Sequence, residues 1–105
     1  MTLQVKLRDT FERNGSRPAL EVAGTVLTYT SLYTKASRIA QTITKIGVEG
    51  EFVGLLAYRS VIAYAGLLGT LLAGKAYFPL SQKFPPSRIL DMISASDCEA
   101  IILGN

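Results

Sequence analysis

The sequence predicts an α/β fold in which a parallel sheet with helical crossovers follows an N-terminal β-hairpin. Two observations predict it: helical periodicity alternates with short apolar runs, and the last three runs, 52–57, 76–80 and 100–103, are separated by helical segments. Strands joined by helical crossovers are parallel. With 105 residues, 49% of them hydrophobic, the chain has the size of one domain at most and enough apolar material for a packed core.

Near the N-terminus, apolar residues recur at every fourth position and predict a helix that Asn14-Gly15 can end. These residues are Leu3, Leu7 and Phe11. Two short strands are expected next, at 19–22 and 26–29. Ala23-Gly24 between them predicts a hairpin turn, because glycine readily adopts positive φ.

A second helix is expected over 30–46, where apolar residues step by four and three positions along one face. They are Leu32, Ala36, Ile39, Ile43 and Ile46. Gly47 is its expected C-cap. The run 52–57, FVGLLA, is apolar without alternation, which favours a parallel strand covered by helices on both faces.

The next predicted helix, 61–73, is apolar on nearly every side and begins after the capping residue Ser60. Gly66 and Gly69 allow a neighbour to approach it closely, and Gly74 ends it. A helix of this kind must be covered all round, so we expect it to be the central element of the fold.

A strand at 76–80, a helix opened by Pro85-Pro86 and a last strand at 100–103 complete the order. The last strand is apolar and has an edge available for a neighbour. We therefore expect residues 1–105, taken alone, to be partly disordered or self-associating, and to be a fixed layer within a longer domain.

The composition excludes several functions. The basic residues are scattered singly, so no nucleic-acid partner is expected. Cys98 is the only cysteine and histidine is absent, which excludes an intrachain disulfide, a Cys/His zinc site and Ser-His or Cys-His catalytic pairs. The longest apolar stretch, 61–73, is too short to span a membrane, and the charged N-terminus does not resemble a signal peptide. A cytoplasmic location is expected.

The stretch GTLLAGKA, residues 69–76, nearly matches the phosphate-binding pattern G-x-x-x-x-G-K-[ST], with Ala76 in the hydroxyl position. A phosphate loop follows a strand and precedes a helix, so that N–H groups face the phosphates. Here the order is reversed. We therefore predict a helix C-terminus, with Lys75 beside it, and no phosphate site.

Several segments together resemble core motifs of adenylation domains in the adenylate-forming, or AMP-binding, superfamily. The order and spacing of the matches are those of the family, and they cover nearly the whole chain. The style of the motifs is most similar to adenylation domains of nonribosomal peptide synthetases. The matching segments are PALE (18–21), GTVLTYTSL (24–32), FVGLLAYRS (52–60), LLAGKAYFPL (71–80) and FPPSRIL (84–90).

Two departures from the family pattern concern the subfamily rather than the fold. Ser31 replaces an acidic residue that would complete a capping box with Thr28. Ser81-Gln82 replaces Asp-Pro after the strand 76–80 and changes the following turn.

The resemblance implies a ligase that uses ATP and Mg²⁺ to convert an amino acid, or another carboxylic acid, into its adenylate. A carrier-protein thiol would then take the acyl group. Residues 1–105 would be the N-terminal part of the large domain, one incomplete domain whose partner is the C-terminal remainder of the enzyme. The segment alone would be inactive and bind no cofactor.

No residue is carried over as catalytic, cofactor-binding or metal-binding, because the family's phosphate loop and catalytic lysine lie further along the chain. Arg59-Ser60, at a strand's carboxyl end, is the best functional candidate, although a helix cap and surface ion pair explain it more simply. The tyrosines are expected to be core or rim residues. They are Tyr29, Tyr33, Tyr58, Tyr64 and Tyr77. The alternative is a self-contained, non-catalytic module that binds a protein partner.

Overall fold

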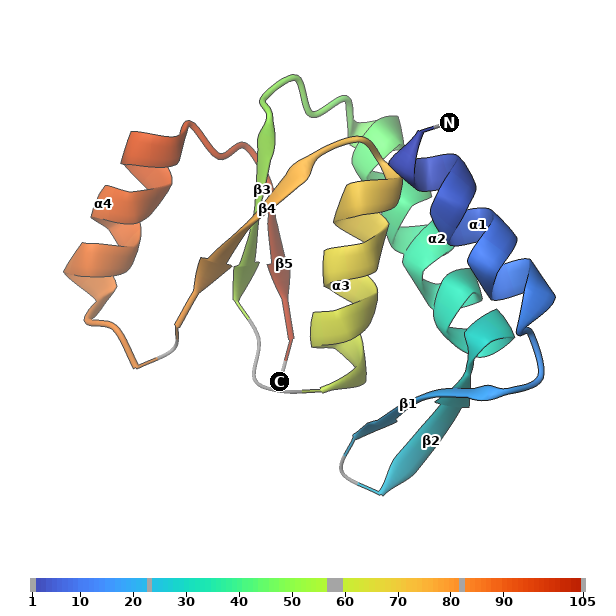
Figure 1. The fold of residues 1–105 in the computed structure, drawn as a ribbon. Helices are drawn as coiled ribbons and strands as arrows, with labels where there is room; N and C mark the ends of the chain where they lie inside the picture. The colour runs from blue at the N-terminus through green and yellow to red at the C-terminus, as the bar shows by residue number, and fades with distance from the viewer. Residues whose placement is uncertain (1, 23, 57–59, 82, 105) are drawn as a thin grey trace.

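The computed structural model describes residues 2–22, 24–56, 60–81 and 83–104. Its elements follow the order expected from the sequence, with a hairpin between two helices and then alternating strands and helices (Figure 1). The elements are α1 (Leu3–Arg13), β1 (Pro18–Val22), β2 (Thr25–Thr28), α2 (Tyr29–Ile46), β3 (Phe52–Leu56), α3 (Val61–Leu72), β4 (Ala76–Leu80), α4 (Pro86–Ser96) and β5 (Ile101–Leu103).

The three later strands form one parallel sheet in the order β4-β3-β5, which confirms the predicted α/β class. The crossover from β3 to β4 and the crossover from β4 to β5 run in opposite directions across this sheet. Right-handed connections therefore place their helices on opposite faces. Figure 1 shows this arrangement: α1, α2 and α3 lie on one side of the sheet, and α4 stands alone on the other.

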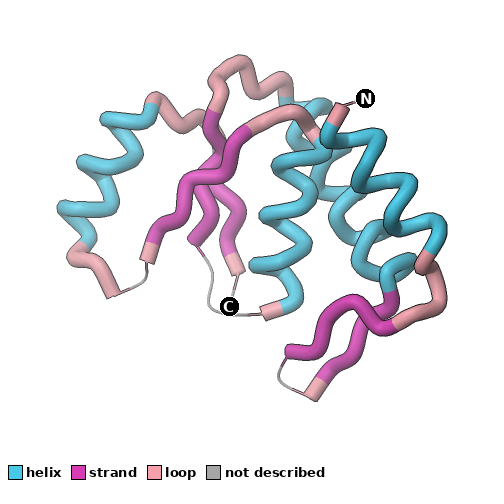
Figure 2. The backbone as a smooth tube through the Cα atoms, in the orientation of Figure 1, coloured by secondary structure: helices cyan, strands magenta, loops and turns pink. Residues whose placement is uncertain are grey.

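The main core lies where α1, α2 and α3 meet. Phe11, Leu32 and Ala65 are buried together there. The ring of Phe11 packs edge-on against Tyr29, with centroids 5.2 Å apart, and also contacts Tyr33 at 5.6 Å. The β1–β2 hairpin is antiparallel and extends away from these helices (Figure 2).

The helix α3 lies between the sheet and α2, and two glycines permit this position. A Cβ atom on Gly66 would lie 3.1 Å from Leu55 of β3 and 3.2 Å from Ile102 of β5. A Cβ atom on Gly69 would lie only 2.7 Å from the backbone oxygen of Ala36 in α2. Close approach at both positions was predicted from the sequence and is confirmed.

Boundaries differ from the sequence prediction by single residues. The second strand ends at Thr28 rather than Tyr29, because the Thr28 hydroxyl accepts a hydrogen bond from the N–H of Ser31 and caps α2 one residue early. Ala73 is the C-cap of α3 rather than its last residue. The predicted strand end Ala57 and turn residue Ala23 lie outside the described residues.

Loops at the amino end of the sheet are held by one side chain that the sequence did not single out. The Glu99 carboxylate accepts hydrogen bonds from the backbone N–H groups of Glu49, at 3.2 Å, and Gly50, at 2.6 Å. It thereby joins the loop before β3 to the loop before β5.

Gly47 ends α2 with a φ of 73°, as expected for a left-handed C-cap.

We expect Gly69→Ala to destabilise the protein that carries this chain by about 1–3 kcal/mol, because the added methyl meets a backbone carbonyl that cannot move aside. Gly66→Ala is the matched control. Its methyl meets flexible side-chain ends, and the higher helix propensity of alanine offsets the contact, so we expect a change within about 1 kcal/mol. Urea unfolding measures both; equal midpoints for the two variants would contradict this packing.

Candidate functional site

The carboxyl ends of the three parallel strands form the candidate site, because ligands of open α/β sheets bind at this edge. The register pairs Leu56 with both Leu80 and Leu103, so the strands end side by side. The N-termini of α3 and α4 lie at the same edge (Figure 1).

Two described hydroxyls at this edge accept hydrogen bonds from the local backbone. The Ser60 hydroxyl accepts a hydrogen bond from the N–H of Ala63, at 3.3 Å, and caps α3 as predicted. The Ser81 hydroxyl accepts from the N–H of Lys83, at 3.1 Å. Arg59, the other residue of the predicted pair, lies outside the described residues, as does Gln82.

A basic and aromatic pair also lies close to this edge. The Arg88 guanidinium stacks 4.3 Å from the centroid of the Phe84 ring, a cation–π contact. This pair was not predicted from the sequence, although the i,i+4 spacing of Phe84 and Arg88 is a signal that points to it.

The stretch 69–76 has the geometry of a helix C-terminus. The N–H of Gly74 donates to the carbonyl of Leu71 and the N–H of Lys75 donates to the carbonyl of Thr70, both at 3.0 Å. With φ of 77° at Gly74, this is a Schellman motif. Its remaining carbonyls repel anions, so the geometry agrees with the prediction of a helix end in place of a phosphate loop.

The tyrosines are distributed as core and rim residues. Tyr29 and Tyr33 contact Phe11, Tyr64 is half-buried and Tyr77 is 39% exposed. Tyr58 lies outside the described residues. The described tyrosines do not gather into an aromatic cage.

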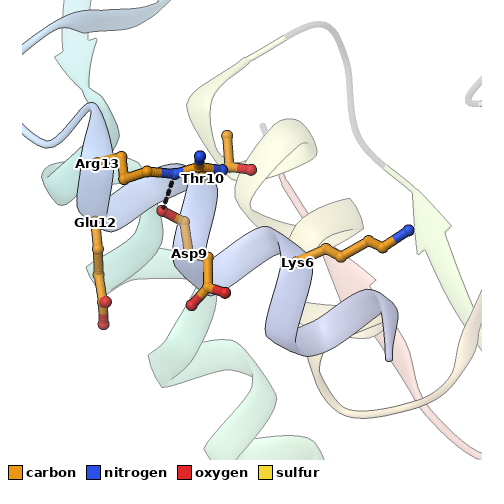
Figure 3. A pocket seen from close by; sticks show the side chains of 5 residues that line it. All are labelled: Lys6, Asp9, Thr10, Glu12 and Arg13. Atoms are coloured by element: carbon orange, nitrogen blue, oxygen red, sulfur yellow. Dashed lines mark hydrogen bonds between the residues drawn. The ribbon is translucent and has the colours of Figure 1, made fainter. Parts of the chain in front are cut away.

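A hollow on the outer face of α1 is lined by Lys6, Asp9, Thr10, Glu12 and Arg13 (Figure 3). All five side chains come from one helix, and two basic groups are balanced by two acidic groups. The Arg13 Nε donates to the Asp9 carbonyl at 3.4 Å. The hollow therefore has no charge preference that would select an ionic ligand.

Within the described ranges, no group of three or more acidic or cysteine side chains is placed to hold a metal ion. Cys98 is a free thiol whose Sγ lies 3.1 Å from the N–H of Gly54 and donates to the carbonyl of Ala100 at 2.9 Å. No helix in this part of the chain is long and apolar enough to cross a membrane.

A family described as "AMP-binding enzyme" matches residues 7–104, nearly the whole chain. The chain belongs to the AMP-binding enzyme family. This confirms the resemblance seen in the motifs. Solved synthetase structures superpose on nearly the whole chain, so the arrangement of the sheet is also that of the family.

Three similar proteins show the scale of the match. Tyrocidine synthase 3 of Brevibacillus parabrevis is 35% identical over 100 residues, which are 94% of this chain and 2% of that protein. The nonribosomal peptide synthetase FmoA3, in an AMPPNP-bound form, is 29% identical with a TM-score of 0.88, over 94% of this chain and 11% of that one. The four-domain synthetase holo-AB3403, bound to AMP and glycine, is 27% identical with a TM-score of 0.83, over 96% and 8%. This chain thus spans a small part of each.

We expect Lys75→Ala to change any ATP affinity of the protein by less than about threefold, because the helix end offers no phosphate contact. Lys45→Ala is the matched control, since Lys45 occupies the last turn of α2. Titration with ATP measures both. A loss of about 100-fold for Lys75→Ala alone, or about 2.7 kcal/mol, would show that Lys75 binds phosphate after all.

Proposed function

We propose that this chain is the N-terminal structural part of an ATP-dependent ligase that activates an amino acid as its adenylate. The observation that carries the proposal is the family match over residues 7–104 together with 35% identity to tyrocidine synthase 3. The FmoA3 and holo-AB3403 structures support the use of ATP and an amino acid, since they contain AMPPNP in one case and AMP with glycine in the other.

The segment contributes scaffold rather than chemistry in this proposal. An adenylating site must align a carboxylate with the α-phosphate, neutralise charge with Mg²⁺ and a lysine, and exclude water from the adenylate. At the carboxyl edge, the Ser60 hydroxyl caps α3 and the Ser81 hydroxyl accepts a hydrogen bond within a turn. The reacting groups would come from the C-terminal remainder of the enzyme, in the cytoplasm, and a carrier protein would accept the acyl group on its thiol.

The alternative is a self-contained module that binds a protein partner through its sheet. The apolar residues left exposed along β5 favour it, since Leu103 is 70% exposed. The same exposure suits an incomplete domain. The family match favours the enzyme, because it covers the motifs of an adenylation domain rather than those of a binding module.

We expect the enzyme that carries this chain to catalyse amino-acid-dependent exchange of pyrophosphate into ATP. The isolated 105 residues should give no exchange, since they lack the groups that position the phosphates. Purified samples of each are assayed with a panel of amino acids, with omission of the amino acid as the control. No exchange by the longer protein would contradict the proposed activity, and exchange by the 105 residues alone would contradict the scaffold role.

A further inference from the structure

The helix α2 presents cations without acids. Lys35, Arg38 and Lys45 are all exposed, and the 18-residue helix contains no aspartate or glutamate. At about 100° of rotation and about 1.5 Å of rise per residue, the three positions fall within an arc of about 80° and span about 15 Å along the helix axis. They form a single-file row on one side of α2, called here the basic row.

The basic row lacks a counter-charge within the described part of the chain, where no carboxylate lies within ion-pair distance of its three cations. The neighbouring helix α1 is different. Its acids Asp9 and Glu12 line a hollow together with the basic Lys6 and Arg13, so its charges are mixed. A helix face that serves only for contact with water is expected to mix charges as α1 does, and α2 does not.

The basic row also opposes the stability of its own helix. Like charges three or four positions apart on a helix repel, and Lys35 and Arg38 are three positions apart. The neighbouring hydroxyls do not compensate, since Thr34, Thr42 and Thr44 donate to carbonyls of α2 itself, at 2.9, 2.9 and 3.0 Å. Conflicts of this kind between local sequence and local stability are expected at functional positions.

The chemistry of the basic row fits carboxylates on a facing helix. The planar guanidinium of Arg38 pairs with a carboxylate through two parallel hydrogen bonds, and lysine adds a point charge on either side. A row one side chain wide matches acids that repeat every three or four positions along a helix. Membranes and nucleic acids are instead recognised by clusters of about four to eight basic residues.

We propose that the basic row of α2 docks an acidic helix of a neighbouring domain in the same synthetase polypeptide. The inference rests on the proposed function. The source of the helix is argued from chain length, since this chain covers 2% of tyrocidine synthase 3 and 8% of the four-domain synthetase holo-AB3403. Exposed ion pairs are individually weak and are screened by salt, so this contact holds two domains together reversibly.

Carbodiimide cross-linking of the longer natural protein tests the proposal, because it joins an amine to a carboxylate in contact with it. We expect mass spectrometry to find Lys35 and Lys45 joined to acids three or four positions apart in one helix outside the adenylation domain. The yield should fall at least about fivefold in about 0.5 M NaCl. Lys6, exposed on α1, is the internal control and should give no such links.

Cross-links from Lys35 and Lys45 that stay within the adenylation domain, or no cross-links from either, would overturn the proposal. Pyrophosphate exchange measured on the same sample keeps the two claims apart. An active enzyme without these interdomain links would contradict the docking and leave the proposed function intact.

A matched pair of charge reversals tests the row itself. Arg38 and Arg13 are both exposed arginines on helices, but Arg13 lies on α1, outside the basic row. We expect Arg38→Glu to lower the yield of the cross-links from Lys35 and Lys45 at least about fivefold, and Arg13→Glu to change it less than about twofold. Arg38→Gln, which removes the charge without reversing it, should give a smaller loss.

Equal yields from the Arg38 and Arg13 variants would overturn the proposal. So would binding of the natural protein to phosphatidylserine vesicles or to duplex DNA that Arg38→Glu abolishes and Arg13→Glu preserves, since a phosphate surface would then be the occupant. A Tm within about 2 °C of the natural protein checks that each variant is folded.

Discussion

The fold depends on how closely α3 approaches its neighbours on two sides. Gly66 lets α3 settle on β3 and β5, and Gly69 lets the carbonyl of Ala36 in α2 come within contact distance of its backbone. Thr70, one turn after Gly66, is fully buried, and its hydroxyl donates to the carbonyl of Gly66 at 2.7 Å. A side chain at Gly69 would meet the carbonyl of Ala36 and push α3 away from α2, whereas one at Gly66 would meet side-chain atoms of Leu55 and Ile102.

This packing places helices and strands around a candidate site to which the described residues add few reactive groups. The crossovers bring the N-termini of α3 and α4 to the carboxyl edge of the sheet, where α/β proteins place their sites. At that edge the Ser60 hydroxyl caps α3 and the Ser81 hydroxyl accepts a hydrogen bond within a turn. In our proposal, this segment therefore forms the scaffold on one side of the site. The reacting groups come from other residues of the enzyme.

Element order could be predicted because each element carries a local signal. Gly47 ended α2, Ser60 began α3 and Pro86 began α4, as the cap and proline rules require. The strand order β4-β3-β5 could not be predicted, since periodicity does not say which strand is central. The same holds for Glu99, whose contact with Gly50 joins residues 49 positions apart. The helix cap at Ser60 was predicted from the sequence. The stacking of Arg88 on Phe84 was not, because it depends on the conformation of the turn between them.

The central claim is that these residues form one layer of a longer adenylating enzyme. The intact mass of the gene product, measured on protein from its natural source, tests it most directly. The account predicts a mass several times the 11.3 kDa of this chain. A product of 11.3 kDa that is monomeric and unfolds cooperatively would contradict it, and would favour the self-contained module instead.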